Sequence, residues 1–257
     1  MALEMKHIRQ IIFCFALFYA TTASSQNFDS LARSMPLVKT FFSKFVGTPE
    51  FSAEVNMGLC DAQGALRMSL PMDLEVSTNC MRQEIDVMGM WPLPPEVKAN
   101  MKIMHVEKID IITRIDTKQL YLIFPGIQAY TTFPISDAVL NQINYQANDL
   151  TIQKTQLGQD IVGEHPCVKI NAVVSEPNHP TENADLWCAT DLQQFPIKIE
   201  AHANGGITKF DFQNVKIGKP DYSLFEVPTN YMAFTNSADI IRYAKEKFQD
   251  SLNVMPK

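Results

Sequence analysis

The sequence predicts a mainly β protein with a few helices: a single curved antiparallel sheet that forms an incomplete, half-open β-barrel, with the helices packed on its concave side. Three observations support this prediction. Apolar and polar residues alternate with a period of two through most of the chain. About ten such segments follow one another, and turn residues rather than long helical crossovers connect most of them.

The N-terminus has the composition of a secretory signal peptide over residues 1–25. Lys6 and Arg9 form a basic start, an unbroken apolar run covers Ile11–Ala20, and small residues suited to cleavage follow at Ala23–Ser25. The alternatives are a short membrane anchor or a buried helix, but a spanning helix needs roughly 20 apolar residues. We therefore expect an exported protein, in the bacterial periplasm or secreted, with no transmembrane segment after cleavage.

Cleavage near Ser25 leaves enough chain for one large all-β domain or two small ones, and we favour one. We expect this domain over residues 26–234, followed by a C-terminal helix and tail over 235–257. The whole chain has 22 basic and 28 acidic residues, and without those of the signal peptide its net charge is near −7. Because such a surface repels phosphate backbones, we expect no nucleic-acid partner.

The first half of the body has the pattern of an antiparallel meander. Pro71 lies inside one of its strands, and because proline cannot donate a ladder hydrogen bond, we expect an edge, a bend or a bulge there. Both faces of 120–124 are apolar, which predicts that this strand is covered on two sides, by a helix or ligand on one and by a lid or partner on the other. Full burial in a closed core is the alternative. The expected strands are 51–59, 66–76, 81–90, 109–115, 120–124 and 128–133.

The second half continues the series of strands. The strongest turn signal is Asn204-Gly205-Gly206, because asparagine and glycine tolerate the positive φ that tight hairpins require. The expected strands are 151–157, 168–174, 184–190, 197–203 and 207–215.

Helical spacing of apolar residues interrupts the strands in three places. The expected helices cover 31–45, 135–146 and a C-terminal segment that Asn236 or Ser237 caps. The last of them has a narrow apolar stripe formed by Ile240, Ile241, Ala244 and Phe248. We expect these helices to fill a sheet that is apolar on its inner side.

A family resemblance appears in segments that follow one another in a fixed order. They are Gly163–Lys169, Asp185–Leu192, Phe195–Glu200 and Ser223–Tyr231, with Met81–Ile85, Leu120–Gly126 and Tyr130 in the first half. Over roughly residues 50–232 the chain resembles the LolA/LolB-like superfamily of periplasmic lipoprotein carriers and outer-membrane lipoprotein-sorting proteins, and most of all its exported branch of unknown function. The resemblance implies an incomplete barrel around a helix or two, whose concave apolar face holds acyl chains in the best-known relatives.

Methionine is concentrated in the first half, where eight of the thirteen lie between Met57 and Met104. Each of them can be explained as an ordinary residue of the hydrophobic core. Together they are also compatible with a cavity whose flexible side chains adapt to an acyl chain. After the Trp91–Pro95 break, residues 96–104 form either a flap over the mouth of the cavity or an inert loop. The candidate ligand-binding residues are Met57, Met68, Met72, Val87, Met88, Trp91, Leu122 and Phe124.

Four cysteines remain after cleavage, and an even number in an oxidising compartment suggests two disulfides. We favour Cys167–Cys188, because a cross-strand register could place them opposite each other. Elimination then pairs Cys60 with Cys80, although a simple meander separates them beyond the roughly 7 Å Cα limit. The alternative is that one or both stay thiols.

The usual motifs of enzymes are absent from the sequence: it has no G-x-S-x-G elbow, no H-E-x-x-H motif and no phosphate-binding glycine loop. His165 and Cys167 are close in sequence, but such neighbours in a strand are not oriented to share a proton. We therefore expect no catalytic residue, no metal and no cofactor.

Two functions fit these observations. The first is a non-catalytic binding protein that holds a lipid, acyl chain or other apolar ligand in the half-open barrel, with a role in lipoprotein or lipid trafficking. The alternative is a structural or protein-interaction module of the cell envelope, with a barrel filled by its own helices and an envelope protein as partner.

Overall fold

The computed structural model describes residues 50–137, 151–175, 181–203 and 206–248, together with Phe42, Gly47 and Leu140. The strands of this part are β1 (Phe51–Asp61), β2 (Leu66–Val76), β3 (Cys80–Asp86), β4 (Lys108–Arg114), β5 (Gln119–Phe124), β6 (Ala129–Pro134), β7 (Thr151–Val162), β8 (His165–Ser175), β9 (Glu182–Ala189), β10 (Phe195–Ala203), β11 (Gly206–Ile217) and β12 (Met232–Phe234). Its helices are α3 (Pro95–Ile103) and α5 (Ser237–Lys247), with 3-10 turns η2 (Pro125–Ile127), η3 (Thr190–Leu192) and η4 (Tyr222–Phe225).

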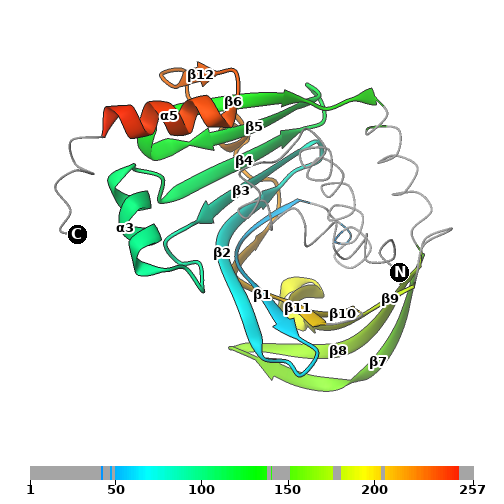
Figure 1. Cartoon of the computed structure of the whole chain (residues 1–257). Helices are drawn as coiled ribbons and strands as arrows, with labels where there is room; N and C mark the ends of the chain where they lie inside the picture. Colours follow the sequence, from blue (N-terminus) through cyan, green and yellow to red (C-terminus); the bar gives the residue numbers. More distant parts are fainter. Residues whose placement is uncertain are drawn as a thin grey trace.

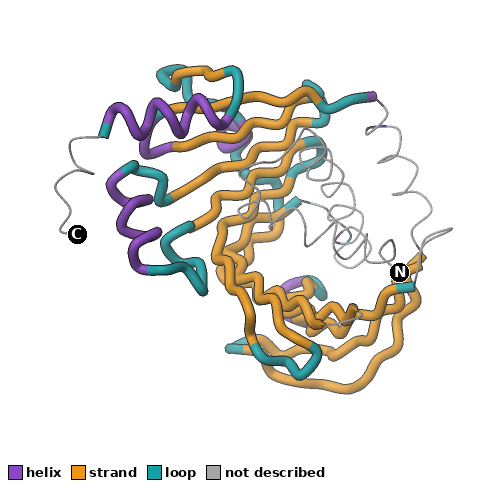
Figure 2. The backbone as a smooth tube through the Cα atoms, viewed as in Figure 1, coloured by secondary structure: helices purple, strands orange, loops and turns teal. Residues whose placement is uncertain are grey.

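Two meanders build one open sheet in the order β12-β6-β5-β4-β3-β2-β1-β11-β10-β9-β8-β7. β1 joins them, because Val55 lies opposite Met72 of β2 on one side and Phe212 of β11 on the other. The sheet curves strongly on either side of β1 and β2, and its ends, β12 and β7, do not meet (Figure 1; Figure 2). The predicted fold class, a mainly β protein with an incomplete barrel, is confirmed.

The period-two pattern determines which side chains face the concave side of the sheet. In β1, Ala53, Val55 and Met57 are buried, whereas Glu54 and Asn56, which lie between them, are exposed. Most buried apolar side chains of the two meanders form one group, and we call its members on the concave face the concave cluster. Its largest fully buried members are Phe51, Met57, Leu70, Met81, Ile85, Leu120 and Phe195.

Pro71 occupies a local edge, as predicted, although β2 continues through it without a break. On the side of β2 that faces β3, the last paired residue is Met72, which lies opposite Ile85. The backbone of Ser69, on the other side of Pro71, forms hydrogen bonds with Trp91 instead. Because the proline lies in this gap, its missing N–H removes no ladder hydrogen bond.

The convex side of β3–β6 is covered by a segment that sequence reasoning missed. Residues 219–231, here called the convex strap, run from β11 to β12, and β12 pairs in parallel with β6. Phe225 of this strap is 1% exposed and packs against Ile112 and Ile123. Since Leu120 of the same strand β5 is buried in the concave cluster, the prediction that this strand is covered on two sides is confirmed.

Several element boundaries differ from the expected ones. β3 ends at Asp86, four residues early, because the side chain of Asp86 accepts hydrogen bonds from the backbone N–H groups of Met88 and Gly89 and closes a turn. The segment proposed as a flap or loop is helix α3, which has proline in its first turn. Helix α5 begins after Asn236, whose side chain accepts from the Asp239 N–H as an N-cap, as predicted.

Some expectations fall outside the described residues. They are the signal peptide, the helix over 31–45, most of the helix over 135–146, and the Asn204-Gly205 part of the turn before β11. The hairpin that this turn closes is present, because His202 of β10 lies opposite Ile207 of β11.

All four described cysteines are free thiols, so the disulfide that we favoured between Cys167 and Cys188 is not present. The register explains the correction. Cys167 lies opposite Ala189, whereas Cys188 lies opposite Val168. Because directly opposed residues share a face and adjacent residues alternate, the two thiols lie on opposite faces of the sheet.

The second predicted disulfide, between Cys60 and Cys80, is also absent. Cys60 lies opposite Leu66 at the start of β2, whereas Cys80 precedes Met81, which lies opposite Val76 at the end of β2. The ten-residue length of strand between these positions corresponds to roughly 33 Å. No disulfide bridges such a distance, so the alternative that these cysteines remain thiols is the one that the structure supports.

Candidate functional site

The concave cluster is the larger of the two groups of buried apolar residues in the described part of the chain. Its centre is a group of aromatic rings at the junction of the two meanders. The Phe51 ring lies 4.6 Å from that of Phe42 and 5.0 Å from that of Phe195, and Phe195 lies 5.5 Å from Phe212. These centroid distances are typical of favourable tilted and edge-to-face contacts. Ile240 and Ala244 of α5 also belong to this cluster, so part of the concave surface packs against a helix of the chain itself.

Six of the eight predicted ligand-binding residues lie in or against the concave cluster. Met57, Met72, Val87 and Phe124 are buried in it, and Met68 and Leu122 are partly buried against it. The other two do not join it. Met88 is partly buried in the turn after β3, and Trp91 is 51% exposed.

The convex face carries a network of charged side chains that sequence reasoning missed. Arg82 on β3 pairs with three carboxylates: Glu75 at 3.5 Å, Asp110 at 3.0 Å and Glu84. Lys108 also pairs with Glu84. The side chain of Arg82 is only 13% exposed, so this network is largely shielded from water. The sequence shows charged residues on the polar faces of three predicted strands. It does not show the strand register, which brings these charges into contact.

Burial shifts the pKa values of these carboxyl groups in different directions. Burial raises the pKa of Glu75 to about 7, because its loss of hydration and the nearby carboxylates outweigh the attraction of Arg82. Burial likewise raises the pKa of Asp110. Burial alone would also raise the pKa of Glu84, but hydrogen bonds from Lys108 and Arg82 lower it. A pKa of about 7 means that Glu75 changes charge near neutral pH.

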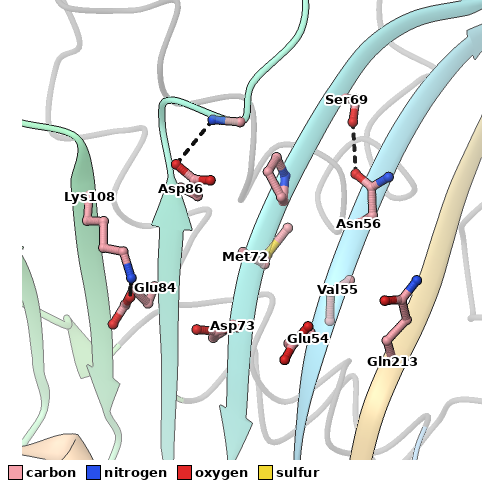
Figure 3. A pocket seen from close by; sticks show the side chains of 12 residues that line it. Glu54, Val55, Asn56, Ser69, Met72, Asp73, Glu84, Asp86, Lys108 and Gln213 are labelled. Carbon is pink, nitrogen blue, oxygen red and sulfur yellow. Dashed lines mark hydrogen bonds and ion pairs between the residues drawn. The ribbon is translucent and has the colours of Figure 1, made fainter. Parts of the chain in front are cut away.

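A polar pocket of about 500 Å³ lies beside this network on the convex face of β11, β1, β2, β3 and β4 (Figure 3). Its ionisable side chains are Glu54, Asp73, Glu84, Asp86 and Lys108. Four carboxylates against one ammonium give a field that favours cations over anions. The other lining residues are Val55, Asn56, Ser69, Pro71, Met72, Gly89 and Gln213.

The pocket is held in shape by local hydrogen bonds. The Ser69 hydroxyl donates to the Asn56 side-chain oxygen at 2.8 Å, which joins β2 to β1 (Figure 3). The Asp86 carboxylate accepts from the backbone N–H of Gly89 at 3.1 Å. Burial, together with the charges of Glu84 and Glu54, raises the pKa of Asp73. None of these polar residues was predicted as a site residue.

The neighbours His165 and Cys167 do not form a nucleophile and its base. The Cys167 thiol donates to the backbone oxygen of His165 at 3.4 Å, and the His165 Nδ1 atom instead contacts the Asp191 carboxylate at 2.8 Å. Burial raises the pKa of the Cys167 thiol, which opposes formation of the reactive thiolate. Within the described ranges, no group of three or more His, Cys, Asp or Glu side chains could hold a metal ion. No helix of this part of the chain is both long and apolar enough to cross a membrane.

No protein-family model and no curated protein matches this sequence. Solved structures give similarities in backbone arrangement. LprF from Mycobacterium bovis is 12% identical, with a TM-score of 0.41, over 78% of this chain and 97% of that chain. The lipoprotein LppX of Mycobacterium tuberculosis is 9% identical, with a TM-score of 0.40, over 74% of this chain and 97% of that one. A LolA superfamily protein from Nitrosomonas europaea is 10% identical, with a TM-score of 0.33, over 76% of this chain and 97% of that one. Identities and TM-scores this low transfer neither a family nor a ligand to this chain.

Proposed function

We propose that this chain is an exported, non-catalytic binding protein that holds a lipid, an acyl chain or another apolar ligand against the concave face of its half-open sheet, with a role in lipoprotein or lipid trafficking. The observation that supports this proposal most directly is the apolar concave cluster, which extends over both meanders of an open sheet. The charged side chains of β2–β4 lie on the convex face instead.

An apolar face of this kind provides enough free energy to hold an acyl chain. Each methylene moved from water into an apolar environment contributes about 0.8 kcal/mol. About ten methylenes therefore contribute on the order of 8 kcal/mol before the costs of association are subtracted. Methionines such as Met57, Met68 and Met72 adapt to a flexible chain, because their thioether side chains are unbranched.

Binding of a fluorescent fatty acid and of an acylated peptide to delipidated protein tests the proposal. We expect saturable binding of at least one of them. Leu122→Asn puts an amide on the concave side and should weaken binding, whereas Thr132→Asn on the opposite face of the neighbouring strand β6 should not. If wild-type protein takes up neither probe, the proposal is wrong.

A second function, a protein-interaction module of the cell envelope with a self-filled sheet, is favoured by one observation. Ile240 and Ala244 of α5 are 0% and 1% exposed within the concave cluster, so the chain itself fills part of that face. A ligand screen in which no lipid binds, together with stoichiometric capture of one envelope protein, would support this function over the first.

A further inference from the structure

Three side chains on the concave side of the first meander each carry a buried polar atom that has no hydrogen-bond partner among the described residues. They are Gln83 on β3, Thr113 on β4 and Thr131 on β6, which are 1%, 0% and 0% exposed. The unpartnered atoms are the Oε1 atom of Gln83 and the Oγ1 atoms of the two threonines.

The strand register arranges two of them in one row across the sheet. Gln83 lies opposite Ile111, Ile111 opposite Leu122, and Leu122 opposite Thr131. Since neighbouring strands are roughly 4.8 Å apart, three such steps place Gln83 and Thr131 roughly 14 Å from each other. Leu122, between them, is one of the residues predicted from the sequence to bind ligand.

The third side chain belongs to the adjacent row. Thr113 lies opposite Met81 on β3 and Leu120 on β5. It is therefore a diagonal neighbour of Gln83, at roughly 7–8 Å. The three polar groups thus extend over a strip that a lipid head group and the first part of its chain can cover.

Unpaired polar atoms at these positions are unfavourable for the free protein. A buried hydroxyl or amide oxygen without a partner costs about 1–3 kcal/mol, and valine would fill the volume of threonine without that cost. The neighbouring positions of the same two rows, Met81, Ile111, Leu120 and Leu122, are apolar. A bound molecule that supplies hydrogen-bonding atoms removes the penalty.

We infer that Gln83, Thr113 and Thr131 form a polar subsite on the ligand-binding face, and that the ligand is a neutral amphiphile with hydroxyl or amide donors and ester or amide carbonyl acceptors. The inference rests on the proposed function and defines the ligand class for that site. The Gln83 Oε1 atom only accepts, so the ligand must carry a donor. The threonine hydroxyls donate to its carbonyl oxygens.

A neutral head group fits better than a charged one. No Lys or Arg belongs to the two described rows, and Arg82 and Lys108, on the same strands, lie on the convex face. An ionised carboxylate or phosphate buried without a cation is strongly unfavourable. A monoacylglycerol, with two hydroxyl groups and one ester, meets these requirements.

The test measures equilibrium binding of monooleoylglycerol and of octadecene to delipidated protein and to single variants. Thr113→Val, Thr131→Val and Gln83→Leu should each weaken binding of monooleoylglycerol about tenfold, the effect of losing one hydrogen bond. They should leave octadecene binding unchanged, and the melting temperature of ligand-free protein should stay equal or rise. Thr113→Ser, which keeps the hydroxyl, should retain binding.

Thr132→Val is the matched control, because Thr132 lies on β6 beside Thr131 but is exposed on the other face. If the variants bind monooleoylglycerol as the wild type does, or if they lower the stability of ligand-free protein, the polar subsite is wrong while the proposed function stands. If wild-type protein prefers octadecene, the ligand class is wrong. If it binds neither probe, the proposed function itself fails.

Discussion

Arg82 is the one cation that contacts Glu75, Glu84 and Asp110 together in the described convex network, so replacing it is a severe test of how this face is stabilised. Methionine at this position keeps an unbranched chain of similar reach but removes the guanidinium. Burial alone would lower the pKa of Arg82, yet the three carboxylates raise it, which means that they stabilise its charged form. Arg82→Met leaves them without this partner.

The size of the expected loss in the free energy of unfolding depends on how deeply these side chains are buried. The side chains of Arg82, Glu75 and Asp110 are 13%, 12% and 11% exposed, so water replaces the lost partner only in part. Removing one partner of a buried ion pair costs about 3–5 kcal/mol, and we expect about 3 kcal/mol here because Lys108 still pairs with Glu84.

Urea unfolding at pH 7.5 measures this loss as the change in the free energy of unfolding. Arg67→Met is the control, because the side chain of Arg67 is 70% exposed and its ion pair with Asp61 should contribute less than about 1 kcal/mol. The loss in Arg82→Met should be smaller at pH 5, where Glu75, whose pKa is raised to about 7, is protonated. Equal losses in the two arginine variants would refute the argument.

Three further predictions concern pH, the convex strap and the thiols. Because the pKa of Glu75 rises from 4.5 to about 7 on folding, its contribution to stability is present below about pH 4.5 and is lost as the pH rises through 7. Glu75→Gln should therefore raise the melting temperature at pH 8 more than at pH 5, and a gain independent of pH would contradict this. Phe225→Ala should lower the free energy of unfolding by about 3–5 kcal/mol, whereas Leu224→Ala, at a position 37% exposed, should change it by less than about 0.5; similar losses would show that the strap is not anchored as described. Alkylation in denaturant without reductant should modify all four described cysteines, as counted by mass spectrometry, and protection of any pair would reinstate a disulfide.

The fold class was predictable because it depends on local patterns. Alternation identified most strands, and the Asn236 cap located α5 within a residue. The two chain segments that required long-range knowledge were missed. The convex strap has no periodic pattern, and β12 has only three residues, so nothing local distinguishes them from a loop.

The candidate site shows the same division between local and long-range information. Six of the eight predicted ligand-binding residues reach the concave cluster, because their face follows from strand parity. The disulfide prediction was wrong because it placed Cys167 opposite Cys188. The true register is shifted by one residue, which puts the two thiols on opposite faces of the sheet. Gln83, Thr113 and Thr131 became candidates only when the register showed that they face inward and have no partner.

The central claim is that the concave face holds a lipid or another apolar ligand. Native mass spectrometry of protein purified from an oxidising compartment, followed by organic extraction of the same sample, tests it most directly. The account predicts a stoichiometric co-purified amphiphile that delipidation removes and that rebinds to the stripped protein. A mass equal to that of the chain alone, together with no rebinding of lipid, would contradict it.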